Sequence, residues 1–206
     1  MIRKEEQMMD IQKTIKSLEA RGYIVHFFET EAEAADYLVE NIRNTTVGTG
    51  GSMTLDALDI LDRLEETNTV YYRNRSKNPE DARKAMFAPV YITSANGVSE
   101  NGEIVNIDGA GNRVAAASYD KERLYYVIGV NKICPDLESA IERARTIAAP
   151  LNAQRLNRNT PCNGRPGKCY DCSAADRLCR NISITLGKML TIGSVEVIII
   201  NRELGY

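Results

Sequence analysis

The chain has 206 residues, of which 43% are hydrophobic and 26% are charged. This length and composition are typical of a folded protein with one sizeable core, and they exclude an intrinsically disordered chain. The 26 Lys and Arg residues nearly balance the 28 Asp and Glu residues, so the net charge is only -2. A chain without a basic field is not expected to bind nucleic acid or an anionic membrane surface. We therefore expect one domain over residues 1–206.

We expect neither a secretory signal near residue 1 nor a membrane-spanning segment near residue 200. Residues 1–6 lack the apolar core of a secretory signal peptide. The most apolar stretch near the other end, residues 195–200, is interrupted by Glu196 and is too short to cross a bilayer. These features predict a soluble cytoplasmic protein.

The sequence contains a single histidine, His26, inside the apolar run at 23–28. One imidazole cannot supply the two or three histidine ligands of many zinc and non-haem iron sites. Nothing around His26 resembles the nucleophile turn of a Ser-His-Asp hydrolase. We expect His26 to be a strand residue at a partly covered edge.

The first part of the chain alternates between strand-like and helix-like segments. Thr30 and Glu33 have the spacing of a capping box, and Pro79 follows Asn78 as at the first position of a helix. The expected elements are a helix over about 8–18, a strand at 23–28, a helix over 34–42, a strand at 46–48, a helix over 55–64, a strand at 69–72 and a helix from 79. This alternation predicts an α/β fold with an open, mostly parallel sheet and helices on both faces.

The pattern changes after residue 90. Two strand-like segments, 90–95 and 103–107, are separated by Asn-Gly turn signals, which predict a hairpin. A strand at 123–130 and a helix over 137–149, ended by Pro150, come next. A polar segment rich in Gly, Pro and Cys (152–181) then precedes a last strand at 195–200.

Four of the five cysteines lie in that polar segment, with the spacing Cys162-x6-Cys169-x2-Cys172-x6-Cys179. In a reducing compartment, such clustering indicates metal ligation before disulfides. Four thiolates are a complete ligand set for a [4Fe-4S] cluster or for zinc, and surrounding Arg and Lys residues favour the thiolate form. The single Cys-x2-Cys favours the cluster, with zinc as the alternative. The segment could also be a loop without a metal, whose thiols are reduced or oxidised to disulfides. Cys134 stands apart and is expected to be a packed small residue.

A glycine-rich loop, Gly48-Thr49-Gly50-Gly51-Ser52, lies between an expected strand and helix. Backbone N–H groups in such a loop can bind an anion, and we take Gly50, Gly51 and Ser52 as candidate ligand-binding residues. The loop is neither a Walker A motif nor a complete dinucleotide fingerprint. A tight turn without a ligand explains the residues equally well.

Two further polar loops follow expected strands. One is Asp108-Gly109-Ala110-Gly111-Asn112-Arg113, and the other is Asn131-Lys132. Asp108 and Lys132 are candidate catalytic residues, and Asn112, Arg113 and Asn131 are candidate ligand-binding residues. Turn formation alone would also favour the Asp-Gly and Gly-Asn pairs. Because loops after parallel strands share one edge of a sheet, we expect the three loops to form one pocket.

The sequence resembles the lactate-utilisation (LUD, formerly DUF162) domain family from about the second strand onward. The resemblance rests on these residues: Gly50-Gly51-Ser52-x-Thr54-Leu55, 102–113, 129–132, 148–153 and the tail from Pro161-Cys162 to Cys179. It implies a fold similar to glucosamine-6-phosphate deaminase, ribose-5-phosphate isomerase and the CoA transferases. Family members are linked to lactate oxidation, often beside iron–sulfur proteins.

Two classes of function remain open. The first is an accessory or electron-relay protein of organic-acid metabolism that binds a small carboxylate or phosphate and a four-cysteine metal centre, with iron–sulfur or lactate-oxidation proteins as partners. The second is a sugar-phosphate isomerase or CoA transferase. The isomerase would use Asp108 as proton acceptor and Lys132 to polarise a carbonyl. The CoA transferase would need a nucleophilic glutamate, for which Glu100 and Glu103 are available. A binding module with structural zinc is a third possibility.

Overall fold

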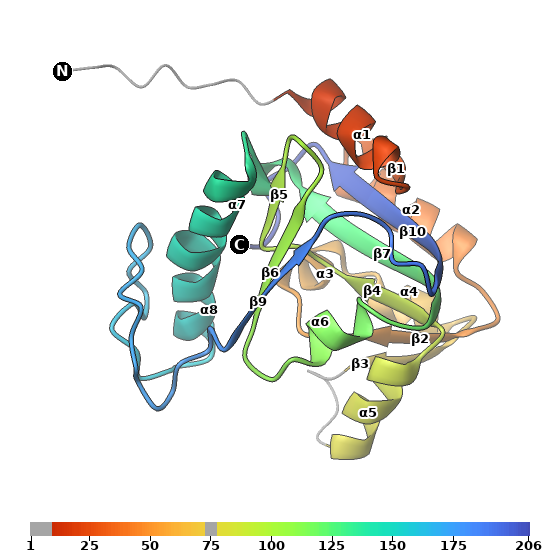
Figure 1. The fold of residues 1–206 in the computed structure, drawn as a ribbon. Coiled ribbons are helices and arrows are strands. Elements are labelled where there is room, and N and C mark those ends of the chain that lie inside the picture. The colour runs from red at the N-terminus through yellow and green to blue at the C-terminus, as the bar shows by residue number, and fades with distance from the viewer. Residues whose placement is uncertain (1–9, 73–77) are drawn as a thin grey trace.

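The structure is a computed structural model that describes residues 10–72 and 78–206. Within these residues, the centre of the fold is a six-stranded parallel sheet in the order β1-β10-β7-β4-β2-β3 (Figure 1). Its strands are β1 (Ile24–Phe28), β2 (Thr46–Thr49), β3 (Thr69–Tyr72), β4 (Val90–Thr93), β7 (Lys121–Gly129) and β10 (Ile192–Ile200). Because all pairs are parallel, the carboxyl ends of the strands share one edge.

Three helices cover one face of this sheet: α2 (Glu31–Asn41), α3 (Met53–Leu58) and α4 (Leu61–Glu65). The capping box of Thr30 and Glu33 starts α2, as the sequence predicts. Leu38, Leu55 and other buried apolar side chains of these helices pack against Val47, Ile92 and Val127 of the sheet. The helix expected over 55–64 is divided, because Asp59 adopts a left-handed conformation with φ of 49°.

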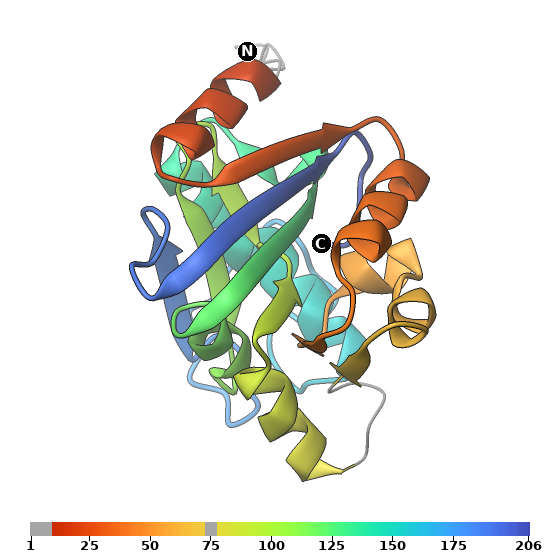
Figure 2. The same cartoon turned by 90° about the vertical axis from the view of Figure 1, so that its right-hand side faces the viewer.

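The other face is covered in large part by a second sheet, which the sequence analysis missed. In the described part of the chain it has four strands in the order β8-β5-β6-β9. They are β8 (Ile133–Cys134), β5 (Gly97–Ser99), β6 (Ile104–Asp108) and β9 (Asn181–Thr185). Helices α1 (Ile11–Ala20), α5 (Pro79–Phe87) and α6 (Asn112–Ala116) complete this layer (Figure 2). Helices therefore lie on both faces of the parallel sheet, as the sequence predicts, and the second sheet is an additional layer.

A long helix with a π-helical turn in its middle packs on the outer face of the second sheet. It consists of α7 (Leu137–Arg143), the π-helical turn η2 (Ala144–Ala148) and α8 (Ala149–Arg155). Its apolar side packs against Val105 and Ile107 of β6. The prediction that Pro150 ends this helix is wrong. Pro150 occupies the first turn of α8, where its missing N–H is tolerated, and the preceding π-helical turn absorbs the irregularity.

Other expectations from the sequence concern the bounds of single elements and the place of His26. The hairpin is formed by β5 and β6, whereas 90–93 belongs to the parallel sheet. The first helix begins at Ile11 in the described chain, and its expected start at Met8 lies outside the described residues. His26 lies on the edge strand β1, where its ring contacts Tyr37 and Glu196. No helix in the described part of the chain is long and apolar enough to cross a membrane.

Candidate functional site

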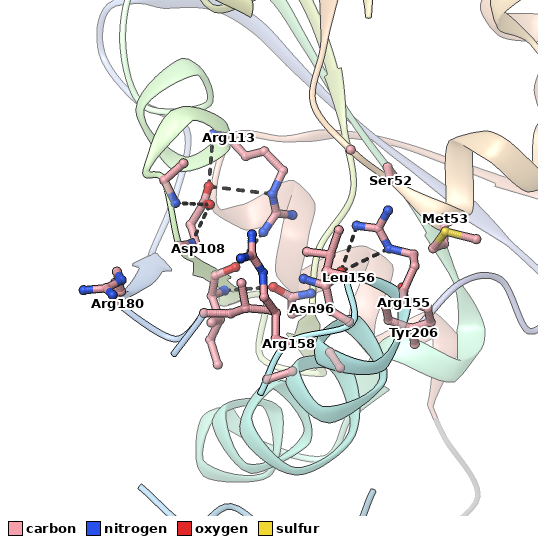
Figure 3. Close-up of a pocket in the computed structure, with 18 of the residues that line it drawn as sticks. Ser52, Met53, Asn96, Asp108, Arg113, Arg155, Leu156, Arg158, Arg180 and Tyr206 are labelled. Carbon is pink, nitrogen blue, oxygen red and sulfur yellow. Dashed lines mark hydrogen bonds and ion pairs between the residues drawn. The ribbon is translucent and has the colours of Figure 1, made fainter. Parts of the chain in front are cut away.

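A cavity of about 460 Å³ opens at the carboxyl edge of the parallel sheet. Its floor comes from residues that follow β2, β4 and β7, and its walls come from the β6–α6 loop, from α8 and from the segment 156–180. Figure 3 shows Asp108 and Arg113 on one side of it, with Arg155, Leu156 and Tyr206 on the other. The predicted site residues that line it are Gly51, Ser52, Asp108, Asn112, Arg113 and Lys132.

Lys132 is the most deeply buried charged residue of the cavity, with 2% of its surface exposed. It follows β7 in the short 3-10 turn η1 (Val130–Lys132). Its Nζ atom donates to Thr54 Oγ1 at 2.8 Å and to Ser94 Oγ at 2.9 Å. Thr54 follows β2 in the first turn of α3, and Ser94 follows β4. Three neighbouring parallel strands therefore bring these three side chains together.

The electrostatic environment of Lys132 is unusual for a lysine. Burial lowers its pKa to about 7, and the positive charges of Arg143 and Arg113 contribute to the shift. No acidic side chain in the described part of the chain forms an ion pair with it. A bound anion would supply the missing negative charge.

Positive charge also dominates the walls of the cavity. Among the described lining residues, the cationic ones are Lys132, Arg113, Arg155, Arg158, Arg177 and Arg180. The acidic ones are Asp108 and Asp176. Asp108 is already paired with Arg113, whose Nε atom lies 3.6 Å from its carboxylate. The cavity therefore has an excess of positive charge that suits a carboxylate or phosphate.

Asp108 holds the β6–α6 loop. One carboxylate oxygen accepts from the N–H groups of Gly109 and Ala110, and the other accepts from those of Arg113 and Val114. With four donors and the Arg113 ion pair, its acceptor sites are occupied by its own loop. This arrangement is that of a loop-forming carboxylate, and it leaves little room for a substrate proton.

The glycine-rich loop contributes space and a helix cap. A Cβ atom at Gly50 would lie 2.5 Å from Cγ of Arg113, so the absence of a side chain there lets Arg113 cross the loop. Gly50 itself is not among the lining residues. Ser52 is the N-cap of α3, and its Oγ accepts from Leu55 N at 3.3 Å. Its hydroxyl is thus engaged with the helix that carries Thr54.

Asn131 lies beside the cavity without lining it. Its side chain accepts from Leu204 N at 3.1 Å and donates to Gly205 O at 3.4 Å. These bonds hold the last residues against η1. They place the ring of Tyr206 in the wall of the cavity.

Neither glutamate considered for a CoA transferase reaches the cavity. Glu100 accepts from the backbone of Asp10 and pairs with Lys13. Glu103 pairs with Arg21 and accepts from Ser99. Both carboxylates serve to dock α1 and the β5–β6 turn.

The four clustered cysteines line a second, small hollow, next to the cavity. Cys162, Cys169, Cys172 and Cys179 are all partly buried and all free of disulfides. Within the described chain, no three His, Cys, Asp or Glu side chains are gathered closely enough to hold a metal ion. Cys134 is buried in β8 and does not line this hollow; its Sγ contacts Lys132 O.

The donor set of this hollow nevertheless fits a soft metal centre. Burial raises the pKa of the Cys179 thiol, and the adjacent Cys162 and Cys169 raise it further, as expected for thiols that face one another. Arg177 donates to the carbonyl oxygens of Cys172 and Cys179, and so holds two of the four backbones. Asp171 N lies 3.4 Å from Cys169 Sγ, a contact suited to a thiolate. Four thiols are the donor type of an iron–sulfur or zinc site, and the Arg177 guanidinium beside them pairs with Asp171.

The sequence profile of the LUD domain matches residues 11–200. The chain belongs to the LUD domain family. The fold is similar to the crystal structure of a DUF162 family protein from Deinococcus radiodurans, with a TM-score of 0.52 and 11% identity, over 92% of this chain and 94% of that one. No curated protein matches the sequence.

In this LUD domain the cavity and the cysteine hollow share a wall. Ala149, Arg177 and Leu178 line both of them. Close packing fixes the wall in place: a Cβ atom at Gly109 would lie 2.9 Å from Leu178 O. Arg180 N donates to Asp108 O at 3.1 Å. The cysteine segment is therefore also one side of the cavity of the LUD domain.

The sequence did not predict several of the residues that line the cavity of the LUD domain. Ser94 directly follows β4, and this position after a strand was the available signal. The sequence predicts a basic surround for the thiols, to which Arg155, Arg158, Arg177 and Arg180 belong, but not that these arginines line the cavity. Tyr206 gave no signal, because its position depends on the bonds that Asn131 makes to the preceding residues.

Proposed function

We propose that this LUD domain acts in organic-acid metabolism by binding a small carboxylate or phosphate in the cavity at the sheet edge. The observation that carries the proposal is Lys132, a buried amine that lines the cavity and lacks an acidic partner among the described residues. Removing a lysine from water is costly unless an opposite charge approaches it. A bound anion would provide that charge.

The arginines of the cavity support the same proposal. Arg113 approaches from the first turn of α6, Arg155 from α8 and Arg180 from the cysteine segment. Planar guanidinium groups suit carboxylate and phosphate, which accept two parallel hydrogen bonds. Cations from three separate segments favour a compact anion that they can surround.

We further propose that Cys162, Cys169, Cys172 and Cys179 hold an iron–sulfur cluster, with zinc as the alternative. An iron–sulfur cluster supplies one-electron transfer. Three observations support this proposal. The four thiols line one hollow, Asp171 N contacts Cys169 Sγ, and Arg177 donates a hydrogen bond to the carbonyl oxygen of Cys172. The shared wall of Ala149, Arg177 and Leu178 would place such a centre beside the anion cavity, from which it could relay electrons to a partner protein.

The enzyme alternatives receive less support from the geometry. An isomerase would need Asp108 as a free base, and its carboxylate is occupied by its own loop. A CoA transferase would need a glutamate in the cavity, and no glutamate is among the described lining residues. An anion-binding LUD domain needs neither.

A thermal-shift panel at constant ionic strength tests the proposal. The probes are L-lactate, pyruvate, inorganic phosphate, ribose 5-phosphate and acetyl-CoA, with chloride as the reference anion. A ligand that binds only the folded state raises the melting temperature, and the shift grows with the logarithm of its concentration over Kd. Stabilisation by lactate, pyruvate or phosphate that is lost in Lys132→Met supports the anion site. No stabilisation by any of them, or equal stabilisation of Lys132→Met, contradicts it.

A further inference from the structure

The surroundings of the Lys132 amine suit a nucleophile as well as a group that binds an anion. Lys132 lines the cavity, and its Nζ atom lies within hydrogen-bond distance of the hydroxyls of Thr54 and Ser94. The two hydroxyls also contact each other, with 3.3 Å between Thr54 Oγ1 and Ser94 Oγ. Thr54 Oγ1 donates onward to Leu204 O at 3.3 Å. The amine is thus held at a fixed point by hydroxyls that can both accept and donate a proton.

The charges around the amine favour its neutral form. The charged groups that act on it are Arg143 and Arg113, and burial holds the pKa of Lys132 near 7. Arg143 is itself held away from the cavity by bonds to Asn131 O and Asn96 O. A neutral amine is the reactive form of lysine, and such desolvation is one of the usual ways to obtain it.

We propose that Lys132 forms a reversible imine with a small 2-oxo carboxylate in this cavity. The inference rests on the proposed anion site and names its substrate class. The carboxylate would meet the arginine-rich wall, and the adjacent ketone carbon would meet the Lys132 Nζ atom. A ligand with both groups on neighbouring carbons could contact the arginines of the wall and the nucleophile at the same time.

The chemistry balances without an oxidant or a cofactor. The Nζ lone pair attacks the ketone carbon, the C–N bond forms, and the carbonyl π electrons move to oxygen, which takes up a proton. The nitrogen then loses a proton, the hydroxyl takes up a second proton, and the nitrogen lone pair forms the C=N bond as water leaves. The resulting iminium loses its remaining N–H proton and becomes the imine. The Ser94 and Thr54 hydroxyls are placed to move these protons between nitrogen and oxygen. The net change is amine plus ketone to imine plus water.

Reductive trapping tests the inference in the full-length protein. Pyruvate and sodium cyanoborohydride are added near pH 7, and intact mass and peptide maps are recorded. The trapped adduct adds the mass of pyruvic acid less one oxygen atom. We expect it on the peptide that contains Lys132, with excess L-lactate, which lacks the ketone, suppressing it by occupying the site.

Two variants make the assignment specific. Lys132→Met removes the amine and should reduce the adduct to the level seen without pyruvate. Lys121→Met is the matched control, because Lys121 is also buried, at 5% exposed, but does not line the cavity; it should trap pyruvate as the unchanged protein does. The peptide map of the unchanged protein remains informative if Lys132→Met does not fold.

The possible failures are distinguishable. Absence of an adduct at Lys132, or an adduct spread evenly over the lysines, overturns the imine. If pyruvate and lactate still raise the melting temperature in that case, the anion site stands and only the covalent step is lost. If neither ligand stabilises the protein and no adduct forms, both proposals fail.

Discussion

The backbone N–H of Gly167 donates a 2.7 Å hydrogen bond to the carbonyl oxygen of Thr146. In a regular α-helix, residue 150 would donate to that carbonyl, but Pro150 has no N–H to give. Gly167 lies between Cys162 and Cys169, so the cysteine segment is anchored to the helix at the position where the proline leaves a carbonyl free. A second backbone bond joins Gly164 N to Pro150 O at 3.4 Å, so the cysteine segment is docked on both η2 and α8.

The cysteine hollow leads to the first prediction. Protein prepared anaerobically with iron and sulfide should be brown, with broad visible absorption, and Cys169→Ser should lose most of that absorption. The reason is that removal of one thiolate leaves an incomplete ligand set. Cys134→Ser is the matched control, because Cys134 is buried in β8 and does not line the cysteine hollow; it should stay brown. Colourless protein with one zinc per chain would contradict the cluster, and no metal under these conditions would contradict both.

The second prediction concerns Arg113. Arg113→Ala should weaken the binding of lactate or phosphate by about 2–5 kcal/mol, as expected for a charge-assisted contact at a desolvated site. Isothermal titration calorimetry at fixed ionic strength measures the loss. Arg63→Ala is the control, since Arg63 forms a surface ion pair with Asp36 and does not line the cavity. Equal affinities of the two variants would exclude a role for Arg113 in binding.

The third prediction follows from the lowered pKa of Lys132. Between its folded-state pKa of about 7 and its ordinary value of 10.5, the unfolded chain holds a proton that the folded chain has released. The free energy of unfolding should therefore rise with pH in this window, by up to about 1.4 kcal/mol per pH unit relative to Lys132→Met. Urea unfolding of both proteins at pH 7, 8 and 9 measures the difference. Parallel pH profiles would show that Lys132 is not held in its neutral form.

The fourth prediction separates a structural from a catalytic role of Asp108. Asp108→Asn keeps the size of the side chain, but it replaces an oxygen that accepts two N–H bonds with an NH2 group. We expect a loss of about 1–3 kcal/mol in the free energy of unfolding, because buried N–H groups of the loop lose their acceptor. The exposed Asp36→Asn should cost no more than about 1 kcal/mol. Full stability of Asp108→Asn would refute the loop-holding role.

Local signals in the sequence predicted the parts of the fold that depend on neighbouring residues. The capping box at Thr30 and the strand β7 formed as expected, because their patterns are set within a few residues. The second sheet was missed, since β9 pairs antiparallel with β6 across more than 70 residues of chain, and β8 is only two residues long. The end of the helix at Pro150 was misjudged, because a π-helical turn leaves no clear mark in the sequence.

The same distinction applies to the site. The parallel order of β2, β4 and β7 brings the residues after these strands, among them Ser52 and Lys132, to one edge. Arg113 instead follows β6 of the second sheet, where this rule does not apply. The sequence could not show that Asp108 is occupied by its own loop. It also could not show that Lys132 lacks a carboxylate among the described residues, since both depend on tertiary contacts.

The most direct test of the anion site is a pair of crystal structures, one grown with saturating L-lactate and one with inorganic phosphate. The account predicts density for the carboxylate or the phosphate in the cavity, with an oxygen within hydrogen-bond distance of Lys132 Nζ and another facing Arg113. A cavity that holds only water in both crystals, or an anion bound elsewhere on the protein, would contradict it.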